Sequence, residues 1–298
     1  MLKYNANLVL EGGGMRGAYT AGVLDFFHDK EINFQLVTST SSSALIGSSY
    51  VASQRGRNYR ILQEIGNNKQ SISIRNLIQH KELFSMDFIF DKLSNESASL
   101  DFTAFSNSST KFIIGTTDLD TGKPIYHSHY KSKSDLLTLI RASCSLPILA
   151  PSITYEGTEI MDGGISEAIP ISPSIESGSQ KHVIVLTRNE GYIKKPTRLT
   201  WLFKKVFKDY PNFVRLLQTR HQLYNKTTEI LAGMEQRGEA FIIRPTKPLQ
   251  ASRVEKNSKK LHGLYIQGYK QAENSFGDLQ RFLENSNQSY YFQENISS

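Results

Sequence analysis

The sequence predicts an α/β fold of three layers, with a mostly parallel central sheet and a mainly helical C-terminal extension. The first observation is the alternation of elements: a strand over 7–11, a helix over 14–29, a strand over 34–38 and a helix over 42–54. Alternating strands and helices are typical of a parallel sheet that is covered by its crossover helices. The second observation is size, because 298 residues with 39% hydrophobic content can enclose a full core.

The elements that follow are less regular. A polar, asparagine- and serine-rich stretch over 66–110 is either a cap over a functional site or surface loops with short helices. A hairpin joins 112–117 to 124–127, with Thr121-Gly122 in the turn. A helix near 133–143 comes next, and a β-branched strand is expected over 182–187.

We divide the chain into a core, 1–188, and a basic, mainly helical extension, 189–298, that packs on the core. Within the extension we expect helices over 213–237 and 256–284, with a strand over 240–243 between them. The polar tail from 285 onward is expected to fray.

The most informative stretch covers 8–17 and reads LVLEGGGMRG. An apolar strand ends there in Gly12, Gly13 and Gly14, and a helix-like pattern follows at once. Glycine lets the backbone turn sharply and approach a ligand closely. The unpaired N–H groups at the start of the helix point outward, so this loop predicts a cradle for negative charge.

Two kinds of negative charge fit such a cradle. Gly12, Gly14 and Gly17 formally satisfy the dinucleotide fingerprint G-x-G-x-x-G. That interpretation needs an acidic residue after the second strand, whereas 38–43 reads TSTSSS. The alternative is an oxyanion hole, which requires a nucleophile nearby. The hydroxyl cluster supplies one, so the second interpretation is favoured.

Ser41 is the candidate nucleophile, because a serine on a tight turn between a strand and a helix has the geometry of a nucleophile elbow. Such turns need small residues on both sides, and here these are Ser39 and Ser43. By itself a serine run is more often a polar turn or a helix cap. A slip of one residue would place Ser42 at the turn, although Ala44-Leu45 favours Ser41.

Asp162 is the candidate base. It lies between an apolar strand end and Gly163-Gly164, so its side chain can project from a tight loop. Alone, Asp-Gly-Gly is usually a turn. Together with the glycine cradle and Ser41, it completes a nucleophile, a base and an oxyanion hole.

With these motifs the chain resembles the patatin-like phospholipases, in particular their bacterial branch. The glycine-rich motif G-G-G-x-R/K-G of that family is matched by Gly12, Gly13, Gly14, Arg16 and Gly17. The motif D-G-G/A is matched by Asp162, Gly163 and Gly164, and the stretches 141–147 and 244–248 are also similar. The elbow motif G-x-S-x-G departs from the pattern, because Ser39 and Ser43 replace both glycines.

The resemblance implies a lipid acyl hydrolase of the phospholipase A, lysophospholipase or carboxylesterase type, which works through an acyl-enzyme and needs no metal or organic cofactor. Asp162 would activate Ser41 directly, with Gly12, Gly13 and Gly14 around the oxyanion. The alternative is a weak or inactive lipid-binding protein, because a positive φ at either substituted glycine would cost about 1–2 kcal/mol of strain. Transfer of the acyl group to an acceptor other than water would use the same dyad.

Arg16 has two interpretations in this scheme. It steadies the glycine loop or meets a phosphate, or else it is an ordinary helix residue that faces solvent. The seven histidines belong to no shared motif, so we expect no histidine base.

Charge predicts an anionic partner. Residues 181–270 carry 19 Lys or Arg against 6 Asp or Glu, within a net charge of +7 for the whole chain. No nucleic-acid motif accompanies this charge, so we expect no nucleic acid and favour a membrane surface. The segment Leu199–Tyr210 fits, because an apolar stripe at helical spacing faces lysines and Trp201 lies at its edge. An ordinary surface helix docked on the core has the same composition.

Location follows from what the sequence lacks. No apolar run is long enough to span a membrane, and the first residues show no secretory signal. The single cysteine, Cys144, fits a reducing compartment and a packed position. We therefore expect a cytoplasmic protein that acts at a membrane peripherally.

Overall fold

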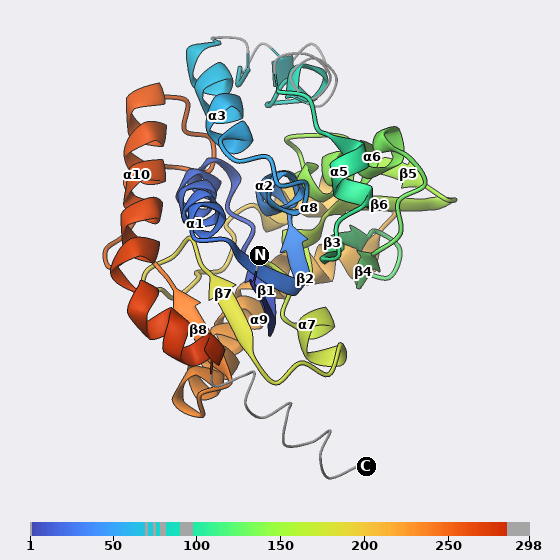
Figure 1. The fold of residues 1–298 in the computed structure, drawn as a ribbon. Helices are drawn as coiled ribbons and strands as arrows, with labels where there is room; N and C mark the ends of the chain where they lie inside the picture. The colour runs from blue at the N-terminus through green and yellow to red at the C-terminus, as the bar shows by residue number, and fades with distance from the viewer. Residues whose placement is uncertain (1, 69–70, 74–75, 78–81, 90–97, 285–298) are drawn as a thin grey trace.

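The computed structural model describes residues 2–68, 71–73, 76–77, 82–89 and 98–284 (Figure 1). An eight-stranded sheet forms its centre, and helices cover both faces of the sheet.

Five neighbouring strands of the sheet run parallel. Strand β1 (Leu2–Leu10) lies between β2 (Ile32–Thr40) and β7 (His182–Val185), with β3 (Lys111–Asp118) beyond β2 and β8 (Ala240–Ile243) beyond β7. The sequence predicts all five, and the structure confirms the mostly parallel sheet. Because β8 pairs with β7, the C-terminal extension contributes a strand to this sheet.

Three strands at the other edge are antiparallel. Strand β4 (Pro124–His127) forms the predicted hairpin with β3. Strand β6 (Thr158–Asp162) also pairs with β3, and β5 (Ile153–Tyr155) completes the edge. Strand β3 continues past the last residue of β2 that pairs with it, and β6 pairs along this extra length.

Side chains alternate between the two faces of the sheet. Along β1, Leu8 and Leu10 belong to the largest hydrophobic cluster, whereas Val9 belongs to a second cluster on the opposite face. The first face is covered by α1 (Gly17–Asp29), α2 (Ser42–Val51), α6 (Lys133–Cys144) and α10 (Ser258–Asn274). The second face is covered by α7 (Ser172–Glu176) and α9 (Pro211–Gln236). These are the three predicted layers.

The C-terminal helix α10 packs along α1 (Figure 1). The two helices approach closely at a pair of glycines. A Cβ on Gly22 would lie 1.9 Å from the Tyr265 carbonyl oxygen, and a Cβ on Gly268 would lie 1.9 Å from the Tyr19 carbonyl oxygen. The predicted helix 256–284 is interrupted at Ser275, and residues 276–284 continue as a separate helical segment. The predicted tail from 285 lies outside the described residues, and the boundary at 188 stays a prediction.

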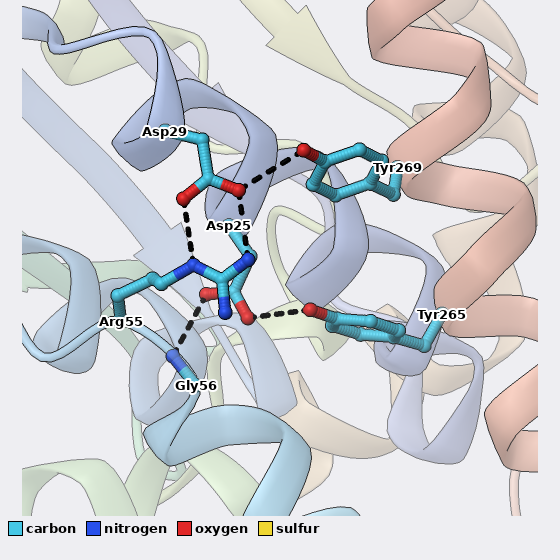
Figure 2. Close-up of polar contacts among 6 residues, drawn as sticks. All are labelled: Asp25, Asp29, Arg55, Gly56, Tyr265 and Tyr269. Carbon is cyan, nitrogen blue, oxygen red and sulfur yellow. Dashed lines mark hydrogen bonds and ion pairs between the residues drawn. The ribbon is translucent and has the colours of Figure 1, made fainter.

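A polar cluster fastens α10 to α1 and to the start of α3 (Arg57–Asn67) (Figure 2). The Tyr265 hydroxyl donates to Asp25 Oδ2 at 2.7 Å, and the Gly56 N–H donates to Asp25 Oδ1 at 3.3 Å. One turn along α10, the Tyr269 hydroxyl donates to Asp29 at 3.0 Å. Arg55 donates two hydrogen bonds to the same carboxylate, at 2.6 and 2.7 Å.

The two tyrosines provide a matched test of this contact. Tyr265→Phe removes a donor from Asp25, which is 2% exposed, so we expect a loss of about 1.5–3 kcal/mol in the free energy of unfolding. Tyr269→Phe leaves the exposed Asp29 with its two bonds from Arg55, so its loss should stay below about 1 kcal/mol. Urea unfolding measures both losses. Equal losses would contradict the conclusion that the buried hydrogen bond from Tyr265 to Asp25 stabilises the contact between α10 and α1.

The segment predicted as one helix over Leu199–Tyr210 is shorter in the structure. Helix α8 covers Thr200–Val206, and α9 then begins at Pro211. The predicted bounds are too long, because the backbone leaves the helical conformation at Phe207, where φ is −110° and ψ is 38°. Phe207 is buried together with Phe203. The remaining described helices include α5 (Phe102–Ser106).

None of the helices in the described ranges combines the length and the apolar character that a bilayer span requires.

Candidate active site

The glycine loop begins where β1 ends. It leads through a short 3₁₀ helix, η1 (Gly14–Arg16), into α1. Gly14 has a φ of +58°, and a Cβ on it would lie 2.6 Å from the carbonyl oxygen of Arg253. Only glycine meets both requirements without strain, so the third glycine of the run is needed for the shape of the loop.

Ser41 forms the turn between β2 and α2. Its backbone has a φ of 57° and a ψ of −138°, a region that residues with a side chain rarely occupy. Ser42, the alternative nucleophile, is already the first residue of α2. The strained residue on the strand-to-helix turn is therefore Ser41, which has the geometry of a nucleophile elbow.

The serines that replace the two elbow glycines fit their positions without strain. Ser39 belongs to β2 and Ser43 to α2, and neither has a positive φ. The Ser43 hydroxyl lies 2.9 Å from the carbonyl oxygen of Leu10 and 2.7 Å from that of Thr40, and Ser39 Oγ donates to β3. The strain considered from the sequence does not arise. The two hydroxyls instead connect the ends of neighbouring strands.

Asp162 meets Ser41 because β6 pairs with the part of β3 that extends past β2. Ser41 Oγ donates to Asp162 Oδ2 at 2.7 Å, and the Gly164 N–H donates to Oδ1 at 2.8 Å. Gly163, the first residue of the 3₁₀ helix η3 (Gly163–Ile165), passes close to β3. A Cβ on it would lie 2.1 Å from the Gly115 carbonyl oxygen.

Burial changes the acidity of Asp162, which is 2% exposed. Desolvation raises the pKa of its carboxyl above the usual value. The hydrogen bond from Ser41 and the charges of Arg220 and Arg253 act in the opposite direction and are outweighed. A carboxylate with a raised pKa accepts a proton more readily, which suits a general base.

The three glycines differ in how their N–H groups are used. The Gly12 N–H donates to the Ala168 carbonyl oxygen at 2.9 Å. The Gly13 N–H makes a long bond of 3.3 Å to Ser42 Oγ. No partner for the Gly14 N–H occurs within the described part of the chain. Gly13 and Gly14 are therefore better placed to bind an incoming oxygen than Gly12 is.

Ser143 is a site residue to which sequence reasoning gave no role. It lies near the end of α6, within the stretch 141–147 that resembles the family. Its hydroxyl accepts from the Ser41 N–H at 2.7 Å and donates to the Gly115 carbonyl oxygen at 2.6 Å. The family motif indicated that this stretch lies near the site, but it did not indicate which backbone groups Ser143 would bind.

We expect Ser143→Ala to lower kcat about 10- to 100-fold while KM changes little. The variant removes the acceptor of the Ser41 N–H and so loosens the strained elbow, and small displacements of a reacting group are costly. Steady-state hydrolysis of a soluble ester measures the effect. Ser145→Ala is the matched control, because among the described residues Ser145 Oγ bonds only to its own helix, at the Arg141 carbonyl. Equal effects of the two variants would refute the positioning role of Ser143.

Arg16 and Gly17 are both packed. Arg16 is 3% exposed, so the interpretation of a helix residue facing solvent is wrong. Burial and the charges of Arg188 and Arg253 lower the pKa of Arg16 to about 10. A Cβ on Gly17 would lie 2.6 Å from Ile46 Cδ1, so this glycine allows α1 and α2 to pack closely.

Two cavities meet at Ser41, and Gly14 and Leu146 also line both of them. The first is apolar, and its other lining residues are Met15, Ser42, Leu45, Ile65, Phe84, Met86, Ile89 and Cys144. Three of these, Phe84, Met86 and Ile89, come from the polar stretch 66–110, so this part of the stretch lies beside Ser41. The choice between a cap and surface loops stays open.

The second cavity is polar. It holds Asp162 and the glycine loop together with the side chains of Arg16, Arg188, Lys194, Arg220 and Arg253. Sequence reasoning placed only Arg16 at the site. The other four cations contributed to the charge of 181–270, but their spacing did not indicate that they converge.

No group of three or more potential metal ligands occurs among the residues that the structure describes.

Comparison with known proteins identifies the family. The model of the patatin-like phospholipases matches residues 8–175, more than half of the chain. The chain belongs to the patatin-like phospholipase family. The match ends before four of the basic residues that line the polar cavity, namely Arg188, Lys194, Arg220 and Arg253. A second model, described as a domain of unknown function, matches 210–284.

The relatives of this chain differ in length. The uncharacterized protein YjjU of Escherichia coli (strain K12) is 26% identical over 82% of this chain and 69% of its own length. Lysophospholipase NTE1 of Scheffersomyces stipitis is 23% identical over 80% of this chain, which spans only 16% of that protein. A crystal structure of VipD from Legionella pneumophila aligns with 94% of this chain and 67% of that one, with a TM-score of 0.44 and 11% identity. The description of the family, patatin-like phospholipase, points to lipid hydrolysis in general.

Proposed function

We propose that the protein is a lipid acyl hydrolase in which Ser41 is the nucleophile and Asp162 is the general base. The observation that carries this proposal is the 2.7 Å hydrogen bond from Ser41 Oγ to a buried carboxylate, made from a strained strand-to-helix turn. A serine hydroxyl is a weak nucleophile unless a base takes its proton, and Asp162 is within reach of that proton.

Acylation begins when Asp162 takes the proton of Ser41 as Oγ attacks the ester carbonyl carbon. The carbonyl oxygen becomes negative and accepts hydrogen bonds from the N–H groups of Gly13 and Gly14. Gly12 has no side chain and so leaves space beside Ser41. Helix α2 starts directly after the nucleophile, so the positive end of its dipole faces the same region. The tetrahedral intermediate collapses, the C–O bond of the alcohol breaks, and Asp162 returns the proton to the leaving oxygen.

Deacylation repeats these steps with water. Asp162 takes a proton from a water molecule as its oxygen attacks the acyl carbon. The bond to Ser41 Oγ breaks, and Oγ takes the proton back from Asp162. The products are a fatty acid and the free enzyme, and every step uses groups of this chain.

The lipid character of the substrate is supported by the apolar cavity. It opens at Ser41 and is lined by aliphatic, aromatic and methionine side chains, which suit an acyl chain and favour its burial by about 0.8 kcal/mol per CH₂ group. A phospholipase A, lysophospholipase or carboxylesterase reaction would place the ester carbonyl at the mouth of this cavity.

The test is release of fatty acid from a lysophospholipid in water enriched in ¹⁸O. Hydrolysis places one ¹⁸O atom in the carboxylate, which mass spectrometry detects. Acyl transfer to another acceptor gives an acylated product without the label. Lipid that binds and is recovered intact would favour the alternative, a lipid-binding protein of this family without activity.

The surface around α8 supports a further part of the proposal, peripheral contact with an anionic membrane. Trp201 is 66% exposed, Leu199 47% and Val206 51%, whereas Phe203 is buried in the core. Exposed lysines at 204, 205 and 208 flank these apolar side chains. A surface with apolar side chains among lysines is typical of interfacial binding.

Trp201 is the chain's one tryptophan, so its fluorescence reports this contact directly. We expect anionic vesicles to shift its emission to the blue, and we expect added salt to reverse the shift because it screens the lysine charges. A variant with Lys204, Lys205 and Lys208 changed to Gln should need much more anionic lipid for the same shift. Equal shifts with neutral and anionic vesicles would contradict the proposal.

A further inference from the structure

Four arginines and one lysine converge on the polar cavity beside Ser41 and Asp162. Arg16 comes from the glycine loop, whereas Arg188, Lys194, Arg220 and Arg253 lie beyond residue 175, where the family match ends. Arg220 comes from α9 and Arg253 from the segment before α10. Elements far apart in the sequence thus build one positively charged chamber.

The two carboxylates that line the chamber, Glu11 and Asp162, make their hydrogen bonds with other groups. Glu11 accepts hydrogen bonds from the Tyr224 hydroxyl at 2.9 Å and from the Thr187 hydroxyl at 3.0 Å. Asp162 is engaged by Ser41 and Gly164. Within the described ranges, none of the five cations forms an ion pair with a carboxylate.

Two buried donors in the chamber also lack partners among the described residues, namely the Nε atoms of Arg16 and Arg220. A buried donor that stays unpaired is costly, and an unpaired guanidinium donor even more so. Arg16 is 3% exposed, so its guanidinium has little access to bulk water. An anion that enters the chamber would accept hydrogen bonds from these donors and would form ion pairs with the arginines.

Burial and nearby like charges lower the pKa values of two side chains in the chamber. Burial, together with the charges of Arg220 and Arg253, lowers the pKa of Lys194 to about 6, so this amine is mostly neutral at pH 7 and the four arginines supply the positive charge. Burial and the charge of Arg253 lower the pKa of Arg220 to about 10. Like charges held close together in a partly desolvated space have this effect.

The cations are held in place by neutral groups. The Arg188 guanidinium lies 4.2 Å from the centre of the Tyr192 ring, and Lys194 Nζ lies 4.6 Å from that of Tyr224. Arg220 donates to the Gly164 carbonyl oxygen at 2.7 Å. Aromatic and carbonyl contacts orient these groups without removing their charge, so they are organised in advance for an anion.

We propose that this chamber binds the phosphate of a lipid head group, so that the enzyme prefers phospholipids whose head is a bare phosphate monoester over those whose head is phosphocholine. The inference rests on the proposed function of Ser41. Arginine donors match phosphate oxygens in geometry and charge. The ammonium group of a choline head would instead be repelled by the same cations.

The position of the chamber fits the chemistry of a glycerophospholipid. Gly14, Ser41 and Leu146 line both cavities, so an ester carbonyl at Ser41 has the apolar cavity on one side and the cations on the other. A lysophospholipid has the matching sequence of groups: an acyl chain, its ester carbonyl, the glycerol and then the phosphate. One molecule can therefore occupy both cavities with its scissile bond at the nucleophile.

The test uses two ether-linked lipids with the same short alkyl chain, a 1-alkyl-glycerol 3-phosphate and the corresponding 1-alkyl-glycerophosphocholine. Neither contains an ester, so calorimetric titration measures binding whether or not the protein is an esterase. We expect the wild-type protein to bind the phosphate lipid roughly 100-fold more tightly than the choline lipid, as two charged hydrogen bonds would give. Similar affinities for both lipids would overturn the proposal.

Variants identify the residues responsible. A protein with Arg188→Gln and Arg253→Gln should lose most of this roughly 100-fold preference. The matched control carries Arg60→Gln and Arg215→Gln, two exposed arginines elsewhere on the surface, and should keep it. Each single variant is measured as well, in case the double variant unfolds. Loss of the preference in the control, or its survival in both single variants and the double variant, would refute the assignment.

Two further outcomes separate this inference from the proposed function. If the phosphate lipid binds tightly while the ester-linked lipid of the same head releases no fatty acid, the head-group site stands and the hydrolase proposal fails. If inorganic phosphate binds in the chamber but the two lipids do not differ in affinity, the chamber is a site for free anions. The lipid inference is then overturned, and the proposal for Ser41 is untouched.

Discussion

Replacing Ser41 with alanine should lower the rate of fatty acid release by roughly 10⁴-fold or more, because the variant removes the atom that forms the acyl-enzyme. The loss should appear in kcat, since the apolar cavity and the cationic chamber remain to bind the substrate. Any residual rate would come from the N–H groups of the glycine loop and from substrate binding, as in other serine hydrolases that lose their nucleophile.

Ser42→Ala is the matched control for this result. Ser42 is the neighbouring hydroxyl, it begins α2, and its Oγ makes only a long 3.3 Å contact with the Gly13 N–H. We expect a loss of no more than about 10-fold, which corresponds to one weak hydrogen bond. If Ser42→Ala were the inactive variant and Ser41→Ala the active one, the nucleophile would be misassigned by one residue.

Replacing Asp162 with asparagine should lower kcat by roughly 10³- to 10⁴-fold. The amide has nearly the same shape as the carboxylate but cannot accept the Ser41 proton in the way that a base does. Binding of an ether-linked lipid should change little, which separates loss of the base from loss of the fold. A variant that retained more than a tenth of the wild-type kcat would exclude Asp162 as the base.

The pH dependence of the wild-type enzyme tests the same residue. Asp162 must be deprotonated to act, so kcat/KM should fall as the pH is lowered through the pKa of this carboxyl. Burial raises that pKa above the usual range for aspartate, so the fall should begin at a higher pH than for an exposed carboxylate. Activity that stays constant down to the pKa of an ordinary aspartate would contradict this role.

The sequence predicted the fold and the motifs that contain Ser41 and Asp162, because each of these depends on a local pattern. Alternating apolar runs located the five parallel strands, and Gly12–Gly14 marked the end of the first of them. The pairing of Ser41 with Asp162 came from motifs and not from spacing. Their contact depends on the length of β3, which extends past β2, and no local pattern indicates that difference.

The serines at 39 and 43 show where sequence reasoning had to remain conditional. Strain at these positions required a positive φ, and the backbone angle of a turn cannot be derived from composition alone. In the structure both residues have the ordinary conformations of β2 and α2, and their hydroxyls bond to neighbouring strands. Of Ser39, Ser41 and Ser43, only Ser41 has a positive φ.

The cationic chamber was beyond the reach of sequence reasoning for a different reason. Three separate segments of the chain supply Arg188, Arg220 and Arg253. Only the packing of the C-terminal extension on the glycine loop brings these side chains together. An excess of basic residues over 181–270 was visible, but it predicted an anionic partner without locating the site. The α8 segment similarly showed a periodic apolar stripe, part of which is buried in the core.

The most direct test of the Ser41–Asp162 pair is covalent labelling of the purified protein with a fluorophosphonate, followed by peptide mass spectrometry. An activated serine attacks the phosphorus, displaces fluoride and keeps the adduct, so we expect labelling at Ser41 in the wild-type protein. We also expect loss of that labelling in a folded Asp162→Asn variant. Absence of the adduct from the folded wild-type protein, or equal labelling of Ser41 in the variant, would contradict a Ser41–Asp162 dyad.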